Sequence, residues 1–149
     1  MKIICPNLKN KEVAREFEEL KNATSEAAAY HIWSQNNGNG IDKAPNGEPS
    51  KLFSDLLEHY NGDRVAAIQA KARTYSKSFK EWFGDWQSED KTNVSKVVDE
   101  NSEPLLVWHG TTENFDAFSK SWRGATDPGD WGLGFYFSPK KSSSEMYGN

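Results

Sequence analysis

The chain has 149 residues and a formal charge of −4 at pH 7, with acidic and basic side chains interspersed, which disfavours nonspecific binding to a nucleic-acid backbone. No apolar run approaches the roughly 18 residues that a membrane-spanning helix needs, and the single cysteine, Cys5, excludes an internal disulfide. Aromatic residues make up 13% of the chain, which favours a folded protein over a disordered one, so we expect a soluble cytoplasmic monomer.

The first part of the chain is predicted to be helical. Residues 12–22 carry apolar side chains at helical spacing, which predicts an amphipathic helix. Residues 26–33 are rich in alanine, the best helix former, and Ser25 can cap a second helix there. Asn-Gly pairs favour positive φ and turns, so we expect residues 35–49 to form a loop.

Three further helices are predicted after this loop. Ser50 can cap a helix over residues 51–60, and Asp63 can cap the next one. A short fifth helix over residues 77–83 is expected to end at Gly84, because glycine is favoured just past a helix C-terminus.

From residue 94 the sequence pattern changes from helical to β. Residues 96–98 and 105–108 flank a turn-prone stretch and predict a hairpin. The four consecutive apolar residues of the second segment predict a strand buried on both faces. A further strand is predicted at residues 134–138, followed by a helix that starts near Pro139.

The order of these elements predicts an α+β fold in two parts. Residues 1–88 form the helical region of about five helices, and residues 94–149 form the β part. The aromatic side chains of residues 79–86, together with Tyr75, could pack the helices onto the sheet as one unit. Both the one-unit and the two-unit organisation remain open at this point.

Polar residues next to the predicted strands indicate a ligand cleft. His109, Gly110 and Thr111 follow the most hydrophobic strand, and the glycines of residues 132–138 open the next one. A glycine beside a histidine lets the backbone approach a flat amide, and a neighbouring hydroxyl adds a hydrogen bond. A nearby aromatic ring could stack on a planar cationic heterocycle.

These residues resemble the NAD-binding signature of the His-Tyr-Glu ADP-ribosyltransferases, which include the poly(ADP-ribose) polymerases and the diphtheria-toxin-like enzymes. The resemblance covers residues 105–149, through Leu-Val-Trp-His-Gly-Thr at 106–111 and Gly-Leu-Gly-Phe-Tyr-Phe at 132–137. In the polymerase branch a second tyrosine stands eleven residues after the first, as Tyr147 does after Tyr136. The family fold implies that this region is the beginning of a split sheet.

The sequence Phe-Lys-Glu-Trp-Phe-Gly-Asp-Trp at residues 79–86, followed by the predicted hairpin and His-Gly-Thr, adds a second resemblance. It resembles the layout of the large multidomain polyvalent proteins of phages and conjugative elements. This resemblance implies a bacterial or mobile-element source and a much longer intact protein.

The family resemblance implies a role for each matching residue near the first strand. His109 would hydrogen-bond a ribose hydroxyl of NAD and hold the dinucleotide bent. Gly110 would pair its backbone with the nicotinamide carboxamide. Thr111 stands where the family has a small hydroxyl residue and would assist.

The second group of matching residues would hold the nicotinamide itself. Tyr136 and Tyr147 would stack on the two faces of its ring, and Ser144 would add a hydrogen bond to its amide. NAD is then the substrate, and no metal is expected. The six predicted NAD-binding residues are His109, Gly110, Thr111, Tyr136, Ser144 and Tyr147.

The resemblance implies mono-ADP-ribosylation of a macromolecule, for which we expect a protein. The family's catalytic glutamate comes from a later strand, whereas this sequence ends at Asn149. We therefore expect the chain to be the N-terminal portion of a transferase, inactive by itself, and interpret Glu113 and Glu145 as exposed charges. The alternative is a noncatalytic helical adaptor or interaction segment of a large phage or mobile-element protein.

Overall fold

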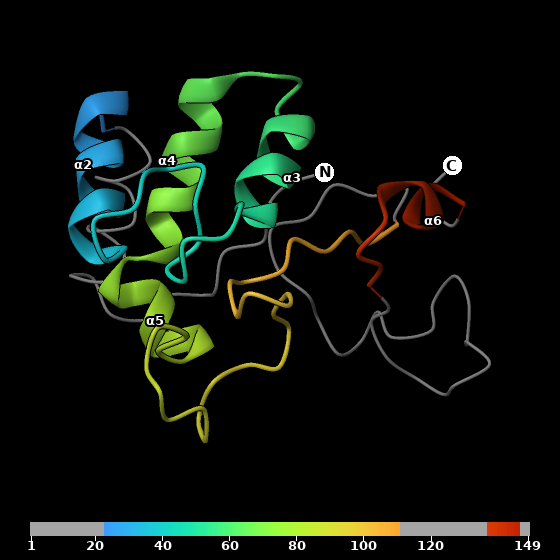
Figure 1. Cartoon of the computed structure of the whole chain (residues 1–149). Helices are drawn as coiled ribbons and strands as arrows, with labels where there is room; N and C mark the ends of the chain where they lie inside the picture. Colours follow the sequence, from blue (N-terminus) through green and yellow to red (C-terminus); the bar gives the residue numbers. More distant parts are fainter. Residues whose placement is uncertain (1–22, 111–136, 147–149) are drawn as a thin grey trace. The chain divides into compact units, whose positions relative to one another are not determined.

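The computed structural model describes residues 23–110 and 137–146. Within them five α-helices follow one another, as Figure 1 shows: α2 (Ser25–Gln35), α3 (Lys51–His59), α4 (Arg64–Thr74), α5 (Lys77–Phe83) and α6 (Lys141–Glu145). The chain divides into two compact units. The helical unit is Leu8–Leu106, and the motif unit comprises Met1–Asn7 and Val107–Asn149. The predicted helix over residues 12–22 lies outside the described residues.

Helices α2 to α5 each begin at a side chain that accepts a hydrogen bond from a backbone N–H of the first turn. Ser50 accepts from Phe53 N at 3.1 Å and Asp63 accepts from Ala66 N at 3.1 Å, as predicted. The cap of α2 is Thr24 rather than Ser25, which is already helical. The prediction for Ser25 was wrong by one residue, because Thr24 has the extended backbone that a capping residue needs.

The loop between α2 and α3 has the backbone that its Asn-Gly pairs predict. Asn37, Gly38 and Gly47 adopt positive φ values of 53°, 75° and 84°. The predicted start at residue 35 is slightly early, because Gln35 still belongs to α2.

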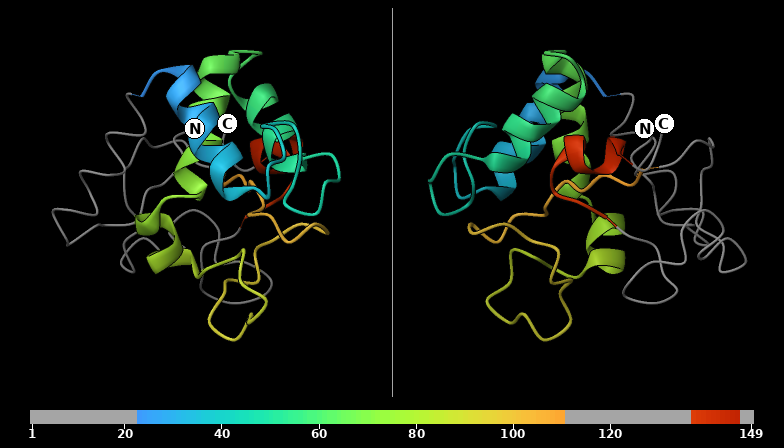
Figure 2. Two further views of the ribbon diagram at one scale, coloured as in Figure 1. Left: turned by 60° about the vertical axis from the view of Figure 1, so that its left-hand side comes forward. Right: turned by 90° about the vertical axis from the view of Figure 1, so that its right-hand side faces the viewer.

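Helix α4 is the centre of the helical unit and contacts α2, α3 and α5. Figure 2 shows α4 running alongside its neighbours. Its buried face consists largely of small side chains, which let the adjacent helices approach closely; the buried residues are Ala67, Ile68, Ala70, Lys71, Ala72 and Thr74. The helices predicted between residues 25 and 83 are therefore present as α2 to α5.

Aromatic side chains complete this core beside α5. The rings of Tyr75 and Trp86 meet edge to face with their centroids 4.9 Å apart, and Trp86 Nε1 donates to the carbonyl of Thr74 at 2.8 Å. Phe83 is buried as well, whereas Trp82 is 57% exposed. Most of the aromatic cluster thus packs inside the helical unit.

Gly84 ends α5 and closes the base of the loop that follows. Its φ of 98° and ψ of 155° lie in a region that is essentially restricted to glycine. A Cβ there would stand 2.4 Å from the carbonyl oxygen of Asn93. Next to this approach, Ser95 N donates to Phe83 O at 2.7 Å, so the two ends of the loop are joined directly.

The predicted hairpin is reduced to a tight turn. Val98 and Pro104 form an isolated antiparallel bridge, and Leu105 N donates to Val97 O at 3.0 Å. The Asp99 side chain accepts hydrogen bonds from the backbone N–H groups of Asn101 and Glu103. A turn held by side-chain hydrogen bonds of this kind competes with the backbone hydrogen bonds between two strands. In addition, Pro104 has no N–H to extend the pairing.

The predicted α+β class is therefore not confirmed within residues 23–110 and 137–146. These residues form helices and isolated bridges, without the hairpin or the beginning of a split sheet. Residues 105–107 are half-buried rather than a strand buried on both faces. The helix predicted near Pro139 is confirmed as α6, which begins two residues later at Lys141.

Candidate functional site

The motif unit is organised around a pair of residues from its two signature segments. Trp108 N donates to Ser138 O at 2.8 Å, and Ser138 N donates to Trp108 O at 2.8 Å. These two hydrogen bonds form an antiparallel bridge between segments that are 30 residues apart in sequence. Trp108, which directly precedes His109, and Ser138, which follows the Gly-rich segment, therefore lie side by side.

His109 lies next to this bridge and contacts Phe137. Because residues 108 and 138 are directly opposite, residues 109 and 137 are the adjacent cross-strand neighbours, with side chains on the other face. The imidazole and the phenyl ring have their centroids 5.4 Å apart at an interplanar angle of 48°. Phe137 is 47% exposed and His109 is half-buried, so both rings are partly accessible to solvent.

Phe137 was not among the residues predicted from the sequence to form the site. The signal that could have identified it is the register, since an antiparallel pairing of the two signature segments places it beside His109. Trp108, which is 4% exposed, is the second residue that was not predicted as part of the site. Its backbone forms the bridge to Ser138 and so positions His109, the next residue.

Ser144 lies on α6 and is 8% exposed. Its hydroxyl donates to the carbonyl of Lys141 at 2.7 Å, which leaves the oxygen lone pairs as its acceptor capacity. Gly110 follows His109 and is half-buried. The remaining predicted NAD-binding residues, Thr111, Tyr136 and Tyr147, lie outside the described residues.

Glu145 is an exposed charge, as predicted. Its carboxylate lies 3.9 Å from the ammonium group of Lys141, and the side chains are 58% and 54% exposed. Glu113 lies outside the described residues. Within the described part of the chain, no group of three His, Cys, Asp or Glu side chains could hold a metal ion.

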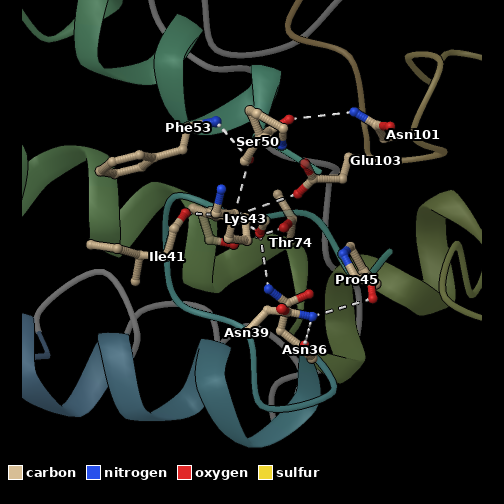
Figure 3. A network of polar contacts seen from close by, with 12 residues as sticks. Asn36, Asn39, Ile41, Lys43, Pro45, Ser50, Phe53, Thr74, Asn101 and Glu103 are labelled. Atoms are coloured by element: carbon tan, nitrogen blue, oxygen red, sulfur yellow. Dashed lines mark hydrogen bonds and ion pairs between the residues drawn. The ribbon is translucent and has the colours of Figure 1, made fainter. Parts of the chain in front are cut away.

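The helical unit contains a second chemically unusual place, a buried ion pair. Lys71 and Glu103 have fully buried side chains, and the ammonium nitrogen lies 3.5 Å from a carboxylate oxygen. The ammonium group also donates to the carbonyl oxygens of Ile41 and Lys43 at 2.7 and 2.9 Å, and to Ser50 Oγ at 3.0 Å. Figure 3 shows Glu103 and Ser50 within this network.

Burial dominates the electrostatics of the pair. Desolvation lowers the pKa of Lys71, although the charge of Glu103 opposes this shift. Desolvation also raises the pKa of Glu103, although the charge of Lys71 opposes it. Each charged form is therefore disfavoured by its surroundings and supported by its partner.

Several polar atoms around the ion pair lack hydrogen-bond partners within the described residues. They are buried and belong to four residues: Asn36 Oδ1, Tyr75 Oη, Asp99 Oδ2 and both carboxylate oxygens of Glu103. Such atoms normally find a partner in a folded protein. This cluster was not predicted from the sequence. The available signal is the position of Lys71, which follows Ile68 by three residues and therefore lies on the same buried face of the helix.

An open cleft of about 460 Å³ also belongs to the helical unit. It is lined by Gln35, Tyr75, Lys77, Lys80, Glu81 and Asp85. None of these residues is among the six predicted for NAD. The ammonium group of Lys80, one of the lining residues, donates to Gln87 Oε1 at 2.6 Å.

The bridge and His109 lie within the part of the chain that matches a known family. The C-terminal third of the chain resembles an ADP-ribosyltransferase. In particular, residues 99–149 match the family described as ADP-ribosyltransferase in polyvalent proteins, which confirms the resemblance inferred from the sequence. No curated protein and no solved structure matches the chain. Among the described residues, no helix has the length and apolar character needed to cross a membrane.

Proposed function

We propose that the chain provides the NAD-binding part of an enzyme that transfers ADP-ribose from NAD to a protein. The observation that supports this most is the Trp108–Ser138 bridge, which joins the two signature segments inside the family-matching region. His109 lies beside that bridge, and Phe137, which directly follows Tyr136 in the sequence, contacts it. His109 and the residue that follows Tyr136 are therefore neighbours, which supports the proposal.

In the proposed complex, the His109 imidazole hydrogen-bonds a ribose hydroxyl of NAD. Gly110 and Thr111 hold the carboxamide, and Tyr136 and Tyr147 enclose the nicotinamide ring. Pyridinium rings bind well against aromatic faces, because the cation interacts with the negative face of the ring.

Ser144 fits the role of an acceptor for the nicotinamide amide. Its proton is already donated to the Lys141 carbonyl, so its lone pairs remain to accept an N–H of the carboxamide. Because the hydroxyl is buried, such a hydrogen bond would be sheltered from competing water.

The proposed reaction breaks the bond between the nicotinamide nitrogen and the ribose carbon. Nicotinamide leaves as a neutral molecule with the bonding electron pair, and the ribosyl group acquires oxocarbenium character. The acceptor nucleophile forms the new bond to the ribose carbon and loses a proton. A carboxylate stabilises this cation in related sugar chemistry, and we assign that role to no residue of this chain.

An NMR titration of the isotope-labelled 149-residue chain with NAD tests the proposed function. We expect shifts that centre on the amides of His109 and Gly110. His109→Ala should weaken NAD binding about tenfold, which corresponds to roughly 1.4 kcal/mol, whereas His59→Ala in the helical unit should leave it unchanged. The absence of NAD-dependent shifts at millimolar NAD would refute the proposal.

The alternative function, a noncatalytic adaptor, has one observation in its favour. Tyr30 and Trp33 on α2 are 67% and 51% exposed, and their ring centroids lie 5.9 Å apart. Exposed aromatic pairs are enriched at protein interfaces. Pull-down of a partner that is lost in Trp33→Ala, combined with no response to NAD, would favour the adaptor.

A further inference from the structure

The side chain of Lys71 ends among four oxygen atoms inside the helical unit. Its ammonium nitrogen donates to the carbonyl oxygens of Ile41 and Lys43 at 2.7 and 2.9 Å, and to Ser50 Oγ at 3.0 Å. A fourth oxygen, from the carboxylate of Glu103, lies 3.5 Å from the same nitrogen. Figure 3 shows the residues that carry these oxygens within one network. We call the four oxygens the ammonium site, and all of them belong to the helical unit.

The three hydrogen bonds of Lys71 use every N–H that its head group can offer. An ammonium group has three donors and no acceptor, whereas a neutral amine has only two N–H groups. Three acceptor oxygens at hydrogen-bonding distance therefore fit the charged form. No proton of Lys71 remains for Glu103, which agrees with the finding that neither carboxylate oxygen has a hydrogen-bond partner within the described residues. Glu103 thus contributes charge to the site rather than a hydrogen bond.

The surroundings of the ammonium site are negative as well as rich in oxygen. Desolvation lowers the pKa of Lys71, whereas the charges of Glu103, Asp42 and Asp99 act in the opposite direction. The side chain of Glu103 is fully buried, and a buried carboxylate is strongly unfavourable without a cation beside it. The site therefore combines hydrogen-bond acceptors with a negative charge that requires a cation. This is the chemistry that recognises a primary ammonium group.

The loop between α2 and α3 is built around this site. Lys43 forms an isolated bridge with Pro49, and its carbonyl oxygen accepts from Asn36 Nδ2 at 2.9 Å as well as from Lys71. Both lone pairs of that oxygen are thereby used. Without Lys71, the carbonyl groups of Ile41 and Lys43 would each have one donor fewer, which is costly for groups that are shielded from water. The conformation of the loop therefore depends on a cation at the ammonium site.

We propose that the ammonium site is a binding site for a primary alkylammonium ion, which Lys71 occupies in the native chain as a tethered ligand. Calcium-binding loops use the same types of ligand, backbone carbonyls and carboxylates, but here α4 supplies the cation. When the lysine side chain is removed, the site should bind a free ion of matching size. n-Propylammonium has the same heavy atoms as the part of lysine beyond Cβ. The inference concerns the helical unit alone and does not depend on the proposed function.

Chemical rescue of Lys71→Ala tests this inference. The amides of Ala44 and Ser50 report on the loop, because they donate to Glu48 O and Asp42 O. We expect both to exchange about a hundredfold faster than in the wild type, because the variant leaves the carboxylate of the pair buried without compensation. n-Propylammonium chloride should restore their protection in a saturable manner. Tetramethylammonium chloride at the same ionic strength should not, because that ion carries the charge without an N–H donor.

Two further variants make the result decisive. Lys71→Met keeps a packed side chain without the ammonium group, so the amides of Ala44 and Ser50 should exchange faster and n-propylammonium should have no effect. Lys96→Ala changes an exposed lysine of the same unit and should exchange as the wild type does. If Lys71→Ala does not fold, Lys71→Met alone decides the inference. Wild-type protection in folded Lys71→Met, or faster exchange in folded Lys71→Ala that n-propylammonium does not reverse, would overturn it.

Discussion

The two units of the chain are stabilised in different ways. In the described part of the helical unit, α2 to α5 begin at capping side chains, and α2, α3 and α5 contact the central helix α4. In the described part of the motif unit, an isolated bridge and a five-residue helix without a side-chain cap carry the structure. Among the described residues, the helices therefore have the stronger local stabilisation. The candidate site residue His109 lies in the segment that has only the bridge beside it.

The largest expected effect on stability is at Gly84, which lies at the base of the loop after α5. Gly84→Ala should destabilise the chain by more than about 3 kcal/mol, because the backbone conformation is unfavourable for alanine and the Cβ collides with backbone atoms. Urea unfolding followed by circular dichroism measures the loss.

Gly62→Ala is the matched control for this prediction. Gly62 also has a positive φ, 83°, but a Cβ there meets nothing within 4 Å. We expect a loss of about 1 kcal/mol, which reflects backbone strain alone. Equal losses at the two glycines would show that the close approach to Asn93 does not constrain the fold.

Among the described residues, Trp86 and Trp108 are buried, one in each unit, and their substitution allows the two units to be compared. Trp86 Nε1 donates to Thr74 O, whereas Trp108 Nε1 is buried without a partner among the described residues. Trp86→Phe should therefore lower the free energy of unfolding by about 3 kcal/mol. The loss for Trp108→Phe should be smaller than this by about 1.5 kcal/mol, because only Trp86→Phe removes a hydrogen bond. Urea unfolding of both variants checks the order, and a larger loss for Trp108→Phe would reverse our view of where the stability lies.

Tyr75 gives the helical unit a sensitivity to alkaline pH. Burial raises the pKa of its phenol above the ordinary value of 10.0, and the charge of Glu103 adds to the shift. Above pH 10 the unfolded chain loses this proton while the folded chain keeps it, so the free energy of unfolding should fall as pH rises. The expected slope is about 1.4 kcal/mol per pH unit.

Tyr75→Phe isolates this contribution. The variant removes a buried hydroxyl that has no partner within the described residues, so at pH 7 its stability should equal or slightly exceed that of the wild type. Above pH 10 the difference between the two proteins should grow with pH. Parallel stability curves between pH 8 and 11 would contradict the assignment.

The smallest expected effects concern the helix caps. Asp63→Ala should destabilise α4 by about 1 kcal/mol, because it removes the acceptor for Ala66 N. Lys140→Asp should instead add about 0.5 kcal/mol in the motif unit, because α6 starts at an extended residue without a capping side chain. Hydrogen exchange of the first-turn amides measures both changes, and a destabilising Lys140→Asp would be inconsistent with the cap geometry.

Local signals in the sequence predicted the helices well. Ser50, Asp63 and Gly84 mark helix ends through hydrogen bonds and backbone conformations that involve only neighbouring residues. The hairpin was predicted from β-prone residues alone, but the Asp99 turn and Pro104 limit it to a bridge. The β propensity of the residues does not reveal the competition between the turn and the hairpin, because the side-chain hydrogen bonds of one turn decide that competition.

The family signature is local, and from it the sequence predicts His109 as a site residue. Among the described residues, the structure adds the contact of His109 with Phe137 beside the bridge of Trp108 with Ser138, while the role of His109 stays a prediction. The pairing of Lys71 with Glu103 could not be predicted, because it joins residues 32 positions apart and carries no sequence pattern. Charged residues are rarely fully buried, so sequence reasoning assigns both to the surface.

The joined base of the loop after α5 has a practical consequence. Phe83 and Ser95 are linked across its ends, and exposed polar residues occupy its tip around residues 89–93. Additional chain at that tip would extend into solvent without separating the two ends, since exposed loop tips tolerate insertions well. A fluorescent reporter or an affinity peptide placed between Glu89 and Asp90 would therefore label the protein while leaving the core of the helical unit intact.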